Sequence, residues 1–163
     1  SPMIVPLIIT AAGMFFFYAR INLVYTFTGV ILAHVALATP FVVITVTATL
    51  VGFDMNMVKA AQSLGAKPIR TFFKVIMPLI LPGIISGALF AFITSFDEVV
   101  VVMFMASIDQ LTIPKQMWAG IRQEISPVIL CMATCLVILS IVLLTTVELL
   151  RRRSEKLRGI KAR

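Results

Sequence analysis

Four long uncharged runs constrain what this 163-residue chain can fold into. They cover residues 1–19, 21–53, 75–96 and 125–147, so each contains 19 residues or more. About 20 apolar residues are enough for a helix to cross the roughly 30 Å hydrocarbon core of a bilayer. Strands are disfavoured because the runs are continuous rather than alternating, and because an open sheet edge cannot be satisfied in lipid. The sequence therefore predicts an all-α, polytopic membrane helix bundle.

The runs predict the domain organisation of the chain. A hydrophobic content of 60% with 13% charged residues lies far from the usage of soluble domains. The Thr39-Pro40 step should kink the second helix rather than divide it into a hairpin. We expect a transmembrane domain over residues 1–150, a cytoplasmic loop over 52–77 and a basic tail over 151–163. The expected spans are about four in number, over roughly 3–19, 24–50, 78–105 and 127–150.

The formal net charge of +7 could suggest binding to nucleic acid, but the placement of the charges favours membrane topology. The tail after Leu150 contains seven basic residues against Glu155, whereas the two basic and two acidic residues of the 106–126 loop cancel. Lys and Arg accumulate on the cytoplasmic side of membrane proteins. We therefore predict a multi-pass membrane protein with a cytoplasmic C-terminus and no nucleic-acid partner.

The polar loop between the second and third expected spans has the signals of two short helices. Asp54 is a candidate N-cap for a helix that runs to about Leu64, and Gly65 stands where a left-handed residue would end that helix. Pro68 fits the first turn of a second helix. Taken alone, this pattern is also compatible with an amphipathic helix lying at the membrane interface.

The same loop resembles the EAA loop of bacterial ABC-importer permeases. An Ala-Ala pair is followed by a Gly and then by an apolar pattern ending in Pro, and Lys59 stands where the family has Glu. The resemblance implies a location in the bacterial inner membrane and a MetI-like, type I importer fold that lacks N-terminal helices in this chain. The implied contacts with a cytoplasmic ATPase are Lys59, Ala60, Ala61, Ser63, Leu64, Gly65, Ala66 and Pro78.

No catalytic signature is present in the sequence. No Gly is followed by Lys, so there is no P-loop, and HExxH, GxSxG and CxxC patterns are also absent. Cys131 and Cys135 could share a helix face, but small packing thiols are favoured over a metal site. We expect a non-catalytic chain without a cofactor. The family resemblance implies a separate ATPase that binds ATP and Mg²⁺, a second permease subunit and an extracytoplasmic solute-binding protein.

The third apolar run ends in polar residues that are costly in a membrane. A carboxylate at the centre of a membrane-spanning helix costs roughly 2.5–3.5 kcal/mol on insertion scales. We expect Thr94, Asp97 and Glu98 to be candidates for lining a solute pathway, and Asp97 is preferred because Thr94 shares its face. At least one of the two carboxylates should face the solute, while the other pairs within the bundle. The alternative is that both carboxylates make hydrogen bonds between helices. We expect His34 to be a packing residue that makes a hydrogen bond within the membrane. The alternative is that it takes part in proton transfer or contacts the solute.

The segment from Ser95 to Pro127 resembles the spermidine/putrescine branch of these permeases. The resemblance rests on four motifs, and it implies a polyamine or a related small amine as solute. Trp118 could then provide a cation–π face, or instead an interfacial anchor. Importers of amino acids, opines, thiamine, ferric ion or aminophosphonates are alternatives, as is a membrane scaffold whose tail binds anionic lipid. The four motifs are Ser95–Val101, Leu111–Pro114, Gly120–Arg122 and Ile125–Pro127.

Overall fold

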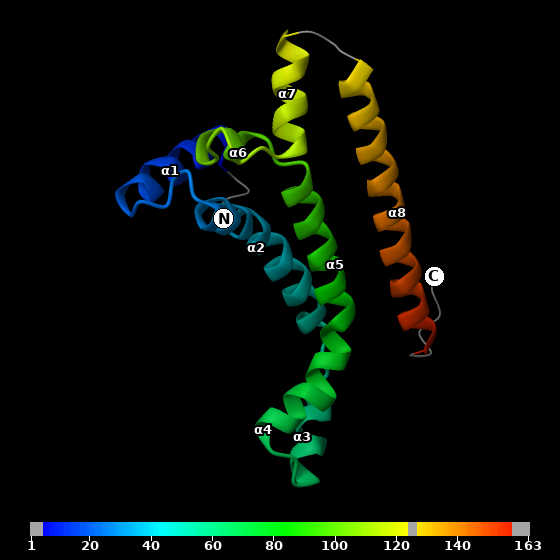
Figure 1. The fold of residues 1–163 in the computed structure, drawn as a ribbon. Helices are drawn as coiled ribbons and strands as arrows, with labels where there is room; N and C mark the ends of the chain where they lie inside the picture. The colour runs from blue at the N-terminus through cyan, green and yellow to red at the C-terminus, as the bar shows by residue number, and fades with distance from the viewer. Residues whose placement is uncertain (1–4, 124–126, 158–163) are drawn as a thin grey trace.

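The computed structural model describes residues 5–123 and 127–157, and within these ranges it contains helices and no strand. This confirms the all-α prediction. Figure 1 shows an elongated arrangement in which α2 and α5 cross, while α8 runs beside α5 and α7. The helices are α1 (Leu7–Arg20), α2 (Phe27–Val51), α3 (Asn56–Ser63), α4 (Pro68–Thr71), the π-helix η1 (Phe72–Ile76), α5 (Met77–Phe96), α6 (Val100–Met105), α7 (Ile113–Gln123) and α8 (Pro127–Leu157).

Three helical segments of the described chain are long and apolar enough to cross a membrane. They are Phe27–Val51, the continuous segment Pro68–Phe96, and Pro127–Thr146. The helix expected over 3–19 is present as α1, but its 14 residues extend only about 21 Å at 1.5 Å per residue. It is therefore shorter than the roughly 30 Å hydrocarbon core.

The second span is one helix rather than a hairpin, as expected. The Thr26 side chain accepts a hydrogen bond from the backbone N–H of Gly29 at 3.0 Å, which caps the start of α2. The helix then continues through Pro40 to Val51. Because proline only removes a donor and crowds the preceding turn, a long apolar helix packed against a neighbour can accommodate it.

Close packing of α2 against α5 depends on two glycines that share one face of α5. Gly83 and Gly87 are both buried, and a Cβ atom at Gly87 would lie 2.9 Å from the Cα of Val42. A Cβ at Gly83 would lie 3.0 Å from the carbonyl oxygen of Thr45 and collide with the hydroxyl of Thr49. Small residues spaced four apart let helices approach closely where water provides no driving force.

The helix expected over 78–105 does not extend that far. Helix α5 ends at Phe96, and the chain turns before it forms the separate helix α6. Figure 1 shows α6 leaving the line of α5 to lie beside α1. The reason is tertiary, because Val101 and Met105 of α6 are fully buried in a core that also contains Ala11 and Ala33.

Hydrogen bonds fasten the loops at the α6 end of the molecule. The backbone N–H of Tyr25 donates to the carbonyl of Met105 at 2.9 Å, and the Gln110 side chain donates to the carbonyl of Tyr25 at 3.1 Å. Lys115 at the start of α7 donates to the carbonyl of Ala106 at 3.1 Å. The connection from α6 to α7 is therefore held against the loop between α1 and α2.

Candidate functional site

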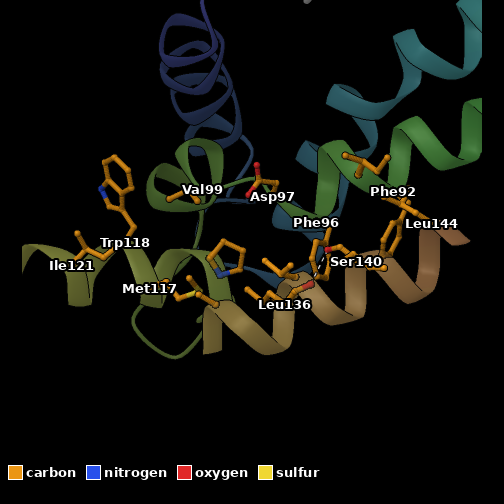
Figure 2. Close-up of a pocket in the computed structure, with 15 residues that line it drawn as sticks. Phe92, Phe96, Asp97, Val99, Met117, Trp118, Ile121, Leu136, Ser140 and Leu144 are labelled. Atoms are coloured by element: carbon orange, nitrogen blue, oxygen red, sulfur yellow. Dashed lines mark hydrogen bonds between the residues drawn. The ribbon is translucent and has the colours of Figure 1, made fainter. Parts of the chain in front are cut away.

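A cavity of about 530 Å³ lies between α5, α7 and α8. Its volume falls within the roughly 300–1,000 Å³ that is common for small-molecule sites. The walls are mostly apolar, and they contain few polar groups (Figure 2). The lining residues are Phe92, Ile93, Phe96, Asp97, Val99, Pro114, Met117, Trp118, Ile121, Ala133, Leu136, Val137, Ser140, Ile141 and Leu144.

Aromatic rings form part of the cavity wall. Phe92 and Phe96 stack one helical turn apart on α5, with ring centroids 5.4 Å apart and an interplanar angle of 25°. Trp118 of α7 lines the same cavity and is 48% exposed. A cation attracted to the face of an aromatic ring lies within about 6 Å of its centroid. The aromatic rings can therefore attract an organic cation although the rings themselves carry no formal charge.

Asp97 is the acidic residue among those that line this cavity. It lies immediately after the last residue of α5, where its backbone N–H still donates to the carbonyl of Ile93 at 3.2 Å. Its carboxylate is exposed, and no hydrogen bond or ion pair to that carboxylate is found among the side chains that the structure describes. Figure 2 shows it in the turn above Phe96. The structure thus brings Asp97 and Trp118, both expected in the pathway, to one cavity.

Glu98 and Thr94 do not line this cavity. The Glu98 side chain is only 6% exposed, and its Oε1 atom accepts a hydrogen bond from the backbone N–H of Val101 at 2.7 Å. Thr94 is half-buried on α5 and is not among the residues that line the cavity. The two neighbouring carboxylates therefore have different surroundings, one at the cavity and one in the protein interior.

A polar contact joins the last turn of α5 to α2. The Oγ of Ser95 and the Nδ1 of His34 lie 2.9 Å apart, in a part-buried hydrogen bond. This places His34 between helices, away from the cavity lining. A buried polar side chain is costly unless it has such a partner, so the bond favours the packing role over the solute role for His34.

The turn at Gly65 is formed as the sequence predicts. Gly65 has a φ of 77°, its N–H donates to the carbonyl of Gln62 at 2.9 Å, and the N–H of Ala66 donates to the carbonyl of Ala61 at 3.0 Å. These two bonds make a Schellman motif at the end of α3. Pro68 then occupies the first turn of α4, again as expected. The polar loop is therefore a helix, a Gly turn and a second helix.

The start of α3 differs slightly from the expectation. Helix α3 begins at Asn56 with Met55 in the N-cap position, so Asp54 lies one residue earlier. The Asp54 carboxylate nevertheless accepts a hydrogen bond from the backbone N–H of Asn56 at 2.9 Å. It makes a local turn that leads into the helix rather than a regular N-cap bond.

The segment 55–74 presents apolar and basic side chains at one end of the molecule. Leu64 is 88% exposed and Ile69 is 75% exposed, and Lys59 and Lys67 are also exposed. A hollow of about 290 Å³ between α3 and α4 is edged by Arg70 and Lys74. Large exposed apolar side chains next to charged ones are typical of interaction surfaces.

The segment also leads directly into α5. Pro78 lies in the first turn of α5, immediately after the π-helix at 72–76. Proline has no N–H to donate back along the helix, and its ring crowds the carbonyl four residues earlier. The wide turn of a π-helix just before Pro78 provides space for that ring.

Of the eight expected coupling residues, the structure places Ala61 and Ala66 half-buried against the hollow and leaves the other six exposed. Those six are Lys59, Ala60, Ser63, Leu64, Gly65 and Pro78. Cys131 and Cys135 are exposed thiols on α8, outside the cavity lining.

Residues 2–156 match the family described as "Binding-protein-dependent transport system inner membrane component". The match covers nearly the whole chain, including α3, the Gly65 turn and α5. The chain belongs to this family. Its membership agrees with the helix–turn–helix loop and with the apolar helices that are long enough to cross a membrane.

Relatives within the family are permeases of polyamine transport systems. The chain is 31% identical over 153 residues to "Spermidine/putrescine transport system permease protein PotC" of Haemophilus influenzae, which covers 94% of this chain and 60% of that protein. It is 36% identical over 103 residues to "Putrescine transport system permease protein PotI" of Escherichia coli, which covers 63% of this chain and 37% of that protein. The chain thus spans about 60% of the length of the first of these relatives.

Several cavity residues could not be found by sequence reasoning. Met117, Leu136 and Ser140 come from α7 and α8, and their apolar surroundings look the same in sequence as those of any membrane helix. Phe92 and Phe96 carried a usable signal, because aromatic residues four apart share one helix face. That face also leads directly to Asp97.

Proposed function

We propose that this chain is a permease subunit of an ATP-driven importer and forms the translocation pathway for a polyamine or a related small amine. One observation carries the proposal most strongly: the exposed carboxylate of Asp97 at an aromatic-walled cavity of about 530 Å³. An extended organic cation needs a negative charge for its ammonium group and aromatic or apolar walls for its methylene groups. The relatives that are polyamine permeases support the same solute class.

The partners of such a permease would meet it at opposite ends. We propose that the segment 55–74 contacts a separate cytoplasmic ATPase that binds ATP and Mg²⁺, while this chain itself carries no cofactor. A second permease subunit would complete the pathway, and an extracytoplasmic binding protein would deliver the solute. In this arrangement the C-terminal tail is cytoplasmic, as its basic residues favour. ATPase closure would then drive the change from one access state to the other.

The test is uptake of labelled putrescine and spermidine by the assembled complex in membrane vesicles. Asp97→Asn keeps the shape of the side chain but removes its charge, so it should lower uptake at least about tenfold, as expected for losing a charge-assisted contact. Assembly and basal ATP hydrolysis should remain. Asp109→Asn is the matched control, because Asp109 is an exposed carboxylate of the α6–α7 loop outside the cavity. Wild-type uptake by Asp97→Asn would exclude this pathway.

Competition experiments separate the proposed solute from the alternatives. Unlabelled polyamines should compete, whereas amino acids, opines, thiamine, ferric ion and aminophosphonates should not. If one of these competes and polyamines do not, the chain serves a different branch of the family. Failure of any ATPase to co-purify through the 55–74 segment would instead favour the scaffold alternative.

A further inference from the structure

The position of Asp97 depends on a sharp turn between α5 and α6. Asp97 follows the last residue of α5 with φ −95° and ψ 7°, and Val99 precedes the first residue of α6 with φ −115° and ψ −42°. Only three residues, 97–99, therefore redirect the chain from one helix into the next. A small change in this turn would swing the Asp97 side chain away from the cavity.

Glu98 holds the α6 side of this turn. The residue is 6% exposed, and its carboxylate accepts the 2.7 Å hydrogen bond from the N–H of Val101. Val101 has one of the first N–H groups of α6, which have no partner within the helix. Val101 and Met105 are fully buried in the core with α1 and α2. The bond therefore ties the turn to a well-packed part of the protein.

The α5 side of the turn has a hydrogen bond of its own. The hydroxyl of Ser95 lies 2.9 Å from Nδ1 of His34, so the last turn of α5 is joined to α2. Asp97 lies between these two attachments in the sequence, and it is one of the residues that line the cavity (Figure 2). Asp97 lines the cavity, whereas its neighbours Ser95 and Glu98 make the hydrogen bonds that hold the turn.

We infer that Glu98 is a positioning residue: it fixes the α5–α6 turn so that the Asp97 carboxylate faces the cavity, and it does not contact the solute. The inference rests on the proposed function of Asp97. It makes a specific chemical claim, namely that the site needs an acceptor oxygen at residue 98 and not a negative charge. Gln keeps that oxygen, whereas Met has a similar length and shape without it.

The first test compares Glu98→Gln with Glu98→Met in the full-length permease within its complex. Glu98→Gln should leave the KM for polyamine uptake within about twofold, and Glu98→Met should raise it about five- to tenfold, as expected for losing a cap bond. The double variant Asp97→Asn/Glu98→Met should transport no worse than Asp97→Asn alone, because Glu98 acts through Asp97. A loss in Glu98→Gln as large as that in Asp97→Asn would overturn the inference, as would additive losses in the double variant.

A second test does not depend on any solute. Cys131 and Cys135 are replaced by Ala, Asp97 is replaced by Cys, and the rate of reaction with a small methanethiosulfonate reagent is measured on the solubilised complex. Adding Glu98→Gln should leave this rate within about twofold, whereas adding Glu98→Met should change it several-fold as the turn shifts. Equal rates in both backgrounds would refute positioning by Glu98. If Asp97→Asn transports normally but these rates differ, the proposed pathway fails and the positioning role stands.

Discussion

Gly87 offers the most direct test of how tightly α2 and α5 pack. A Cβ added at this position would lie 2.9 Å from Val42 Cα and would also collide with the Thr45 hydroxyl. Carbon atoms in ordinary contact are about 3.5–4.0 Å apart, so α2 and α5 would have to separate by about 1 Å. Because the nearest carbon is backbone, no rotamer change can relieve the contact. Overpacking of this kind costs about 1–3 kcal/mol.

A matched variant isolates the packing effect in Gly87→Ala. Replacing Gly by Ala within a helix stabilises the helix itself by about 1 kcal/mol, and this gain is shared by every such variant. Gly13 lies on an exposed face of α1, where an added Cβ would have nothing within 4 Å. The difference between Gly87→Ala and Gly13→Ala should therefore equal the cost of overpacking alone, about 2 kcal/mol.

The measurement is the thermal unfolding midpoint of the purified complex in detergent, read from the monodisperse fraction left after heating. For a chain of this size, a difference of about 2 kcal/mol corresponds to roughly 4–8 °C in Tm. Adding Thr45→Ala to Gly87→Ala should restore part of the loss, since it removes the hydroxyl but leaves Val42 in place. Equal Tm values for Gly87→Ala and Gly13→Ala would refute the close approach of α2 and α5.

Three further predictions follow from the turn, the topology and the polar pair. Gly65→Val should uncouple ATP hydrolysis from uptake at normal expression. No atom would clash with the added Cβ, but a residue with a side chain costs about 1–2 kcal/mol at φ 77°, so the turn should change; normal uptake would contradict this. In intact cells, an impermeant thiol reagent should label a cysteine at Asp109 but not one at Lys67, and the reverse pattern would overturn the topology. Ser95→Ala should lower Tm by leaving His34 unpaired at a cost of about 1–3 kcal/mol, whereas Ser95→Thr should not; equal Tm values would exclude a stabilising bond.

The features that sequence reasoning predicted correctly are those with local causes. The Gly65 turn follows from the conformational freedom of one residue, and the start of α4 follows from the fixed backbone of Pro68. Such signals lie within a few residues of their effect. They can be read without knowing what the segment packs against.

The break after Phe96 has a cause that the local sequence hides. Val99 to Val102 continue the apolar run, so hydrophobicity alone extends the helix to Met105. The chain turns because Val101 and Met105 fit a core built with α1 and α2, and because the Glu98 carboxylate accepts a hydrogen bond from the first turn of the new helix. Asp97 was expected to face the pathway from within a helix, whereas it reaches the cavity from the turn that follows that helix.

The uninterrupted helical segment from Pro68 to Phe96 has a mechanical consequence. Its 29 residues extend about 44 Å at about 1.5 Å per residue, so it can act as a lever arm between α4 at one end and Asp97 at the other. A rotation of about 10° about one end of a rod this long carries the other end by about 8 Å. The π-helical turn at 72–76 lies close to the α4 end, where a fulcrum gives the largest displacement at the cavity. Under the proposed function, a modest push on α4 would be converted into a displacement long enough to open or close a passage for a small solute.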